Sequence, residues 1–300
     1  MLSRFIRSTW FTFNRALDSL PGAGRQGSPQ PVRILLGDMP SWCRDIRARL
    51  DPRVYRLSTT RFEEADFADH DAIIPFRIRE LKLLNTLSPV IRARAIIPSL
   101  EAIERLDDKQ AFHQALCQMG YESFTPRRLE SFEILSRASD PSLFPFVLKK
   151  RRSEWGEHSI IIKDAEQLAG CRQQLSDEAF MMQHYVAGEH EYASHILMKN
   201  GTVRFLLNVH YAMPRTPIIR GNAHRVSIKR FDGSDQLRPF FGKLLNDLGF
   251  DNGTCCIDYK MTAGKPQIFE INPRFGGSLA RAPKAYVEAY LSALGEGRPA

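Results

Sequence analysis

The sequence lacks paired-cysteine motifs, long apolar runs and blocks of like charge. Its five cysteines form no C-x-x-C pair and are odd in number, which argues against a zinc ribbon and against a disulfide framework. No apolar run approaches the length of a membrane-spanning helix. These absences favour a globular protein of a reducing compartment, and we expect a cytoplasmic location.

The charge of the chain is positive but dispersed. The net charge is +8, from 42 Lys and Arg residues against 34 Asp and Glu residues. Residues 1–30 contribute +3 of it, because four arginines stand there against one aspartate. The even spread of the rest weakly favours anionic ligands and argues against a nucleic-acid-binding stripe, so we expect no nucleic-acid partner. A chain of 300 residues with 43% hydrophobic residues is long enough for two or three packed layers.

Residues 1–30 are interpreted as a basic leader followed by a Gly/Pro linker. Residues 1–20 are aromatic, arginine-bearing and poor in acid, and they lack the long apolar centre of a secretory signal. Four interpretations stay open: weak contact with a membrane surface, a transit peptide, a helix docked on the protein, and a poorly ordered leader. The stretch PGAGRQGSPQP at residues 21–31 is a linker, because glycine, proline and serine at this density stop regular elements.

Residues 31–105 are predicted to form a small parallel α/β domain. Three short apolar runs in it are expected to be buried strands: Val32–Asp38, Asp71–Phe76 and Arg94–Ser99. Short apolar strands that alternate with helical stretches are typical of a parallel sheet.

A helix and a series of strands are predicted beyond this domain. Asp107 or Asp108 can cap a helix that Gly120 ends, and by itself this segment is an ordinary amphipathic helix. The expected strands are Phe146–Lys150, Ser159–Lys163, Phe180–Val186, Glu191–Met198, Val203–Tyr211, Thr254–Lys260 and Gln267–Asn272. The last two bracket the turn MTAGKP and are expected to form an antiparallel hairpin.

The second strand of this hairpin begins the stretch QIFEINPRFGGSL, in which polar and apolar residues alternate. Glu270, Asn272 and Arg274 share one face by the two-residue period of a strand, although Pro273 ends regular pairing. Phe269 and Ile271 are then expected to point into a core.

The first strand of the hairpin contributes Asp258, in a similar apolar frame. Carboxylate and amide oxygens on neighbouring strands are the ligands that Mg²⁺ prefers. The alternative is a solvent-facing hairpin with alternating polar residues. The tail PRFGGS favours the metal site, because it adds a fixed turn, a cation and two permissive glycines beside the acidic residues.

With these motifs, the chain resembles the ATP-grasp superfamily, which includes carbamoyl-phosphate synthetase, biotin carboxylase and D-alanine:D-alanine ligase. The most specific stretch is EINPRFGGS, and the match runs from about Asp107 to about Pro283. The resemblance implies an α/β fold with α+β lobes, in which a parallel pre-ATP-grasp domain (31–105) precedes a two-lobed ATP-grasp domain (106–300). Residues 123–186 correspond to a small nucleotide-covering lobe, and residues 187–290 correspond to a metal and substrate lobe.

The resemblance also implies roles for individual residues. The ligands of Mg²⁺ or Mn²⁺ are Asp258, Glu270 and Asn272. The basic residue of DKQAF, Lys109, and that of PFVLKK, Lys149, contact ATP phosphates. Arg274 lies near the transferred phosphoryl group or the substrate.

The stretch MQHYVAGEHEY is similar to the hinge between the two ATP-grasp lobes. The similarity implies adenine contacts for Gln183, Tyr185 and Val186 and a ribose contact for Glu191. Glu189 is the alternative for the ribose, because the spacing after the preceding glycine is one residue longer than in several relatives.

Two features depart from the family pattern. Relatives commonly have Glu at the position of Gln183. The phosphate-covering loop is usually rich in small residues, whereas RRSEWGEHS has only Gly156. Its closing motion is therefore in question, although backbone amides can still bind phosphate. Ser159 is assigned a phosphate contact, and Arg225, one of five basic residues after Tyr211, is assigned to the substrate.

The stretch HEYASH resembles a zinc-protease motif but does not match its spacing. His190 and His195 are five residues apart rather than four, which turns them away from each other on a helix. On a strand they point to opposite faces, so we expect structural or surface histidines rather than a zinc site.

The expected function is that of an ATP-dependent carboxylate-amine ligase, with ATP and Mg²⁺ or Mn²⁺ as cofactors. The resemblance implies an acyl phosphate intermediate, with Arg274, Lys149 and Arg225 as catalytic residues. The expected partners are a small-molecule carboxylate and an amine, and a homodimer is an open alternative to a monomer. The main alternative is an ATP-binding protein without ligase turnover. A basic membrane-associated or nucleic-acid-binding module is a third reading.

Overall fold

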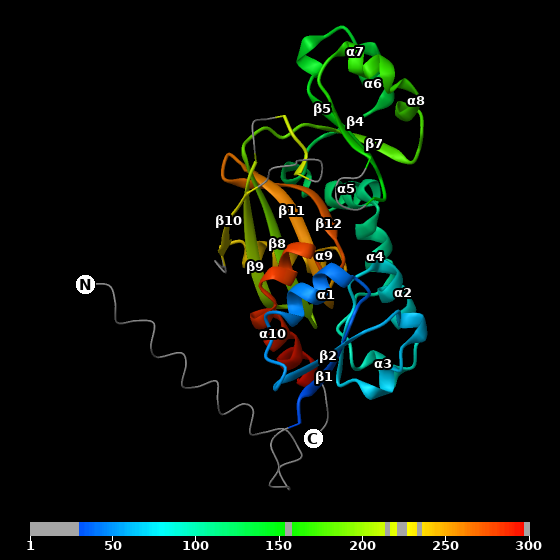
Figure 1. Ribbon diagram of the computed structural model, residues 1–300. Coiled ribbons are helices and arrows are strands. Elements are labelled where there is room, and N and C mark those ends of the chain that lie inside the picture. The colour runs from blue at the N-terminus through cyan, green and yellow to red at the C-terminus, as the bar shows by residue number, and fades with distance from the viewer. Residues whose placement is uncertain (1–29, 154–157, 214–216, 221–226, 233–235, 297–300) are drawn as a thin grey trace, which may run out of the picture.

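The computed structural model describes residues 30–153, 158–213, 217–220, 227–232 and 236–296, and for 227–232 it describes the backbone alone (Figure 1). The expectations for the leader concern residues outside these ranges and stay predictions. Within the described ranges, no helix has both the length and the apolar character needed to cross a membrane.

The N-terminal domain is a three-stranded parallel sheet in the order β2-β1-β3. Its strands are β1 (Val32–Leu36), β2 (Tyr55–Thr59) and β3 (Ala72–Ile74), and its helices are α1 (Pro40–Arg47), α2 (Ile78–Thr86) and α3 (Pro89–Arg92). This part of the chain lies at the bottom of Figure 1, in blue and cyan. The parallel α/β architecture predicted from the apolar runs is confirmed.

The prediction of a strand at Arg94–Ser99 is wrong. This segment makes a single bridge, between Ala95 and Ile73, and then leaves the sheet. Ala95 and Ile96 are buried all the same, because they pack into the two cores of the domain. An apolar run indicates that its residues are buried, but buried residues need not belong to a paired strand.

A small antiparallel sheet in the order β4-β7-β5-β6 forms the lobe at the top of Figure 1. Its strands are β4 (Arg128–Leu129), β5 (Phe146–Lys150), β6 (Ser159–Ile162) and β7 (Phe180–His184). Short helices cover it: α6 (Ser131–Ser136), α7 (Ala165–Gly170) and α8 (Arg172–Leu175). This lobe has an apolar core of its own, built from residues between Leu129 and Met182.

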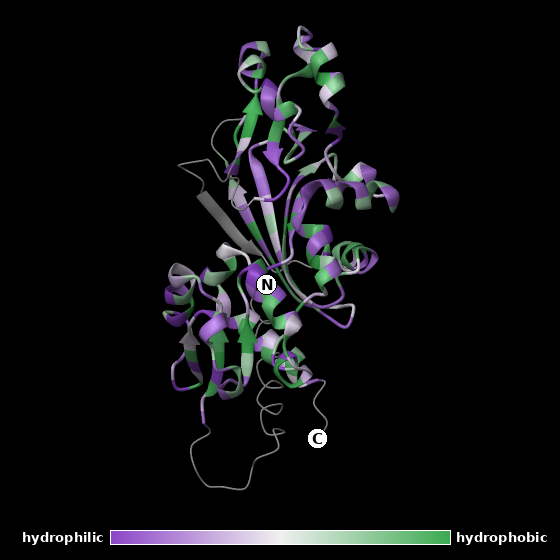
Figure 2. Cartoon of the chain, turned by 90° about the vertical axis from the view of Figure 1, so that its right-hand side faces the viewer, coloured by the Kyte–Doolittle hydropathy of each residue, from purple (hydrophilic) through white to green (hydrophobic). Residues whose placement is uncertain are grey.

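The larger antiparallel sheet, in the order β10-β9-β8-β11-β12, lies in the middle of the molecule. Its strands are β8 (His190–Lys199), β9 (Thr202–Ala212), β10 (Ser227–Asp232), β11 (Gly253–Thr262) and β12 (Lys265–Asn272). The accompanying helices are α4 (Leu100–Asp107), α5 (Lys109–Gln118), α9 (Arg238–Asp247) and α10 (Pro283–Gly295). Helices carry both hydrophobic and hydrophilic residues, as expected of helices that cover a sheet (Figure 2).

The helix predicted from DDKQAF is α5, and Asp108 caps it. The carboxylate of Asp108 accepts hydrogen bonds from the backbone N–H groups of Gln110 at 2.9 Å and Ala111 at 3.2 Å. Since α4 ends one residue earlier, the chain turns sharply at Asp108 and delivers Lys109 to the start of α5. The cap therefore fixes the position of a residue predicted to bind phosphate.

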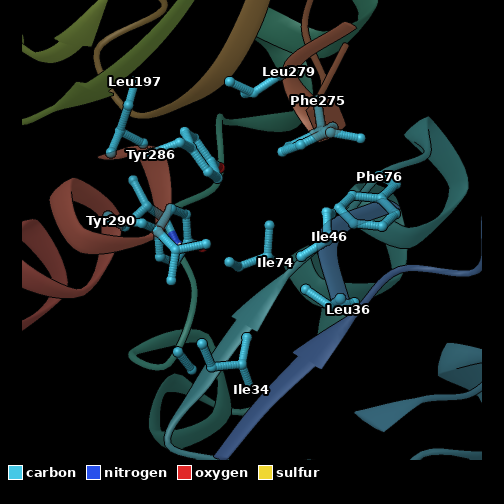
Figure 3. Close-up of a cluster of buried hydrophobic side chains, with 14 of the residues drawn as sticks. Ile34, Leu36, Ile46, Ile74, Phe76, Leu197, Phe275, Leu279, Tyr286 and Tyr290 are labelled. Carbon is cyan, nitrogen blue, oxygen red and sulfur yellow. The ribbon is translucent and has the colours of Figure 1, made fainter. Parts of the chain in front are cut away.

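Helix α10 joins the N-terminal domain to the large sheet through one apolar core (Figure 3). The hydroxyl of Tyr290, on α10, donates to the carbonyl of Ile73 and accepts from the N–H of Ile96, both at 2.7 Å. Residues from both sides of the predicted boundary at residue 105 thus share a core. The boundary itself stays a prediction.

Candidate active site

β11 and β12 form the predicted antiparallel hairpin, and its register places Asp258 directly opposite Glu270. A register shift follows, since Tyr259 pairs with Ile268 and leaves Phe269 as an extra residue on β12. The expectation that Phe269 points into the core is wrong. A β-bulge breaks the two-residue alternation, so Ile268 and Ile271 enter the core while Phe269 lines a cavity beside Glu270.

This cavity, of about 540 Å³, lies where the three parts of the chain meet. Of the residues assigned to the site from the sequence, those that line the cavity are Lys109, Lys149, Ser159, Gln183, Tyr185, Val186, Glu191, Asp258, Glu270, Asn272 and Arg274. The N-terminal domain contributes Met39, Ser41 and Trp42 to its wall. The alternative ribose residue, Glu189, is exposed and is absent from the described wall. Arg225 lies outside the described residues.

At one end of the cavity, which we call the lysine end, Glu270 faces Lys109 and Lys149. The ammonium group of Lys109 lies 3.2 Å from the Glu270 carboxylate, and that of Lys149 donates to the carbonyl of Phe269 at 3.1 Å. Burial opposes ionisation of Glu270, but the two lysines and a hydrogen bond from the Asn272 amide outweigh it and lower its pKa to about 2. Burial lowers the pKa of Lys149 to about 7, and the attraction of Glu270 offsets part of that effect.

At the other end, which we call the arginine end, Arg220 joins Asp258 and Glu191. Its guanidinium lies 2.7 Å from the Asp258 carboxylate and 3.2 Å from that of Glu191. It also lies over the ring of Tyr211, 4.4 Å from the centroid. Burial raises the pKa of Asp258 and raises that of Glu191 to about 7, and Arg220 only partly opposes these shifts.

The wall predicted to bind adenine comes from β7 and the segment that follows it. Gln183 is buried and its amide donates to the carbonyl of Pro126 at 3.4 Å. The Val186 carbonyl accepts a hydrogen bond from Lys260 at 2.9 Å, and the hydroxyl of Tyr185 accepts one from the backbone N–H of Ile218 at 3.2 Å. The segment is thus held by polar contacts with the large lobe.

The two histidines of HEYASH lie on opposite faces of β8, as predicted. His195 is fully buried, and its Nε2 lies 2.7 Å from the hydroxyl oxygen of Ser278, whereas His190 is exposed. Burial lowers the pKa of His195 to about 3, so it is neutral. Nowhere in the described ranges do three His, Cys, Asp or Glu side chains gather as metal ligands.

The hairpin side chains fit a magnesium ion with few protein ligands. Asp258 and Glu270 present carboxylate oxygens from paired strands, and the amide nitrogen of Asn272 bridges them, at 3.0 Å from Glu270 and 3.4 Å from Asp258. Rotation of that amide would present its oxygen instead. Mg²⁺ usually takes one or two protein carboxylates and completes its shell with waters and phosphate oxygens, so this small set suits it.

A family model described as an ATP-grasp domain matches residues 106–278. The chain belongs to the ATP-grasp family. A curated ATP-grasp relative is the carbamoyl phosphate synthase large chain of Bifidobacterium animalis subsp. lactis, which is 26% identical over 199 residues. That alignment covers 62% of this chain and 17% of the relative, so the chain spans a small part of that protein.

Solved structures of similar fold include two ligases. D-alanine–D-alanine ligase from Bacillus anthracis, complexed with ATP, superposes with a TM-score of 0.59 at 15% identity, over 89% of this chain and 98% of that one. Phosphoribosylamine–glycine ligase from Thermotoga maritima gives a TM-score of 0.57 at 14% identity, over 89% and 76% of the two chains. At these identities the similarity establishes the ATP-grasp fold.

Sequence reasoning missed several residues of the cavity wall. Lys260 follows Asp258 by two residues on β11, and the strand period alone was sufficient to place both on one face. Arg220 carried no such signal, because it is one of several basic residues in a stretch without periodicity. His195 and Ser278 are joined only by tertiary contact.

Proposed function

We propose that the protein is an ATP-dependent ligase that activates a carboxylate as an acyl phosphate for attack by an amine, with release of ADP and phosphate. The arrangement at the lysine end carries the proposal. Lys109 and Lys149 are buried side chains on different lobes: Lys109 pairs with Glu270, the carboxylate opposite Asp258, and Lys149 donates to the carbonyl of the adjacent Phe269. Two cations beside a pair of carboxylates suit a nucleotide phosphate bound with its metal ion.

The nucleotide would lie along the wall between the two lobes. We assign the adenine contacts to Gln183, Tyr185 and Val186 and the ribose contact to Glu191, which lines the cavity while Glu189 is exposed. The carbonyl of Val186 already accepts a hydrogen bond from Lys260, so this position of the hinge is fixed before the nucleotide binds.

Asp258, Glu270 and Asn272 would hold Mg²⁺, or Mn²⁺ in its place. When bound, the ion would neutralise charge on the phosphates of ATP. Ser159 lies at the start of β6 on the cavity wall and would contact a phosphate through its hydroxyl.

Phosphoryl transfer to a carboxylate requires two anions to approach each other. Lys149 and Arg274, both buried and both on the cavity wall, would offset this repulsion and stabilise charge in the transition state. Arg225 would bind the substrate carboxylate through a further positive charge. The acyl phosphate formed would then be attacked by the amine.

The second candidate is an ATP-binding protein of the same fold without ligase turnover. It is motivated by the stretch RRSEWGEHS, which has a single glycine where a phosphate-covering loop commonly has several. Residues 154–157 of that stretch lie outside the described ranges. The two candidates share the nucleotide site and differ in whether ADP forms.

Release of ADP in the presence of Mg-ATP and mixed carboxylates and amines separates the two candidates. We expect ADP release that depends on both substrates, with a ligated product detectable by mass spectrometry. Glu270→Gln is expected to abolish ADP release while circular dichroism shows an intact fold. Full turnover by this variant would refute the assignment of Glu270, and nucleotide binding without ADP release from any mixture would favour the second candidate.

A further inference from the structure

The guanidinium of Arg220 occupies the space between two carboxylates that the proposed function assigns to other ligands. Asp258, assigned to the metal, lies 2.7 Å from it, and Glu191, assigned to the ribose, lies 3.2 Å from it. The side chain of Arg220 is 23% exposed, and those of Glu191 and Asp258 are 9% and 10% exposed. One partly buried guanidinium is thus shared between two buried carboxylates.

A divalent cation and Arg220 cannot both pair with Asp258 in this arrangement. An ion bound to Asp258 would stand within a few ångströms of the guanidinium, and like charges at that separation repel strongly in a partly buried site. The metal must therefore displace Arg220 from Asp258, or an anion must lie between the two cations.

The remaining charges on the cavity wall disfavour a divalent cation bound alone. Among the described wall residues, the cationic side chains are Lys109, Lys149, Arg220, Lys260 and Arg274, and the carboxylates are Glu191, Asp258 and Glu270. This excess of cations attracts a polyphosphate and repels a bare metal ion.

We propose that Arg220 is an internal counter-ion that competes with the divalent metal for Asp258 and thereby makes metal binding depend on the nucleotide. The proposal rests on the proposed function, because that function assigns Asp258 to the metal and Glu191 to the ribose. The ribose of a bound nucleotide would form a hydrogen bond with Glu191, and its phosphates would add negative charge to the cavity. Arg220 would then exchange its contact with Glu191 for one with phosphate. Arg220 acts as a positioning residue, since it holds the two carboxylates ready while the site is empty.

The contacts of Arg220 are suited to a side chain that changes its ion-pair partner when ligands bind. Among the residues that the structure describes, its Nη1 has no hydrogen-bond partner despite its ion pair with Glu191, so this contact is geometrically imperfect. Its bond to Asp258 is short, and its stacking on Tyr211 would persist through a small shift of the guanidinium. Arg220 and the metal ion would therefore compete mainly for Asp258.

Mn²⁺ binding, measured by electron paramagnetic resonance without and with ADP, tests the proposal independently of turnover. We expect Arg220→Gln to bind Mn²⁺ alone roughly tenfold more tightly than the native protein, which corresponds to the loss of one competing ion pair. ADP should then strengthen Mn²⁺ binding less in the variant than in the native protein, because the coupling between the two ligands is reduced. Arg220→Lys keeps a competing cation and should resemble the native protein.

Arg204→Gln is the matched control. It removes an arginine that pairs with a single carboxylate, Glu296, away from the cavity wall, and it should leave Mn²⁺ binding unchanged. If Arg220→Gln proves unfolded, Tyr211→Leu removes the ring under the guanidinium and should shift Mn²⁺ affinity in the same direction by a smaller factor.

The results separate failure of this inference from failure of the proposed function. Equal or weaker binding of Mn²⁺ alone by Arg220→Gln, with normal binding in the presence of ADP, would overturn the role of Arg220 and leave the metal site standing. No Mn²⁺ binding by any form, with or without ADP, would overturn both. Tighter binding of Mn²⁺ alone by Arg220→Gln, with unchanged binding by Arg204→Gln, would support the proposal.

Discussion

The lysine end and the arginine end of the cavity present similar carboxylates in different electrostatic surroundings. Glu270 and Asp258 face each other across one strand pair, yet the pKa of Glu270 is lowered to about 2 and that of Asp258 is raised. Burial opposes ionisation at both positions. Glu270 pairs with Lys109 and has the ammonium of Lys149 nearby, whereas Asp258 shares Arg220 with Glu191 and is repelled by the charge of Glu270.

The difference arises from what surrounds each carboxylate. Lys109, Lys149 and the amide of Asn272 favour the ionised form of Glu270, whereas the neighbouring charge of Glu270 opposes ionisation of Asp258. The two residues are paired directly across the hairpin, so strand position does not explain the difference. A carboxylate with surplus positive charge nearby is ionised before any ligand binds. A carboxylate that shares its cation has a less stable ionised form. The lysine end is thus prepared for phosphate, and the arginine end is prepared for exchange of its cation.

The largest expected effect is on ADP release, at the lysine end. Lys149→Met should lower the rate of ADP release roughly 100-fold or more, because a preorganised cation at the transferred phosphate is lost. Lys150→Met is the control, since the neighbouring ammonium lies over the ring of Phe180, 5.9 Å from its centroid. A coupled assay for ADP measures both, and an equal loss in the two variants would show that Lys149 has no special role.

A smaller effect is expected on stability, and it allows Glu270 and Asp258 to be compared directly. In protein free of metal and nucleotide, Glu270→Gln should lower the free energy of unfolding by roughly 1–3 kcal/mol, because Lys109 loses its ion-pair partner and Lys149 loses a nearby negative charge. Asp258→Asn should lower it less or raise it slightly, since burial disfavours the ionised carboxylate there. Urea unfolding gives both values, and an equal loss in the two variants would contradict the comparison.

The smallest expected effect is a change in pH dependence at the arginine end. Glu191 has a pKa of about 7 in the folded chain against an ordinary value of 4.5, so between these values the folded state binds more protons than the unfolded state. Its contribution to the free energy of unfolding therefore falls as pH rises, by at most about 1.4 kcal/mol per pH unit. Glu191→Gln removes this slope.

Urea unfolding of native protein and Glu191→Gln between about pH 5 and pH 7, without metal or nucleotide, measures the change. The stability of the variant relative to native protein should rise with pH across this window. Two parallel stability curves would show that Glu191 titrates as it does in the unfolded chain.

Much of the fold was readable from local pattern. Strands β5, β8, β9, β11 and β12 were predicted within a few residues, because each combines β-prone residues with polar or turn-forming boundaries. Strand β2 was missed because none of its residues is fully buried, so it presents no apolar run. Arg94–Ser99 was assigned to a strand because it is apolar, although its burial comes from packing alone.

The candidate site was readable only where the sequence has a strong local motif. EINPRFGGS, DKQAF and PFVLKK pointed to residues that the structure brings to one cavity. The bulge at Phe269 left no comparable signal, and it redirects that side chain to the cavity wall. Arg220 could not be distinguished from the other basic residues of its stretch, because its partners lie 29 and 38 positions away in the chain.

The sequence by itself determined the family, the order of the parallel and antiparallel parts, and most of the charged residues of the site. Those properties follow from hydrophobic periodicity and from short motifs, in which interacting residues are close in the chain. Only the tertiary structure decided how the charges pair. Lys109 pairs with Glu270 while Lys149 from the other lobe bonds the adjacent Phe269 carbonyl, and one arginine serves Asp258 and Glu191. These pairings depend on the tertiary structure because Coulomb energy depends on distance in space and on burial.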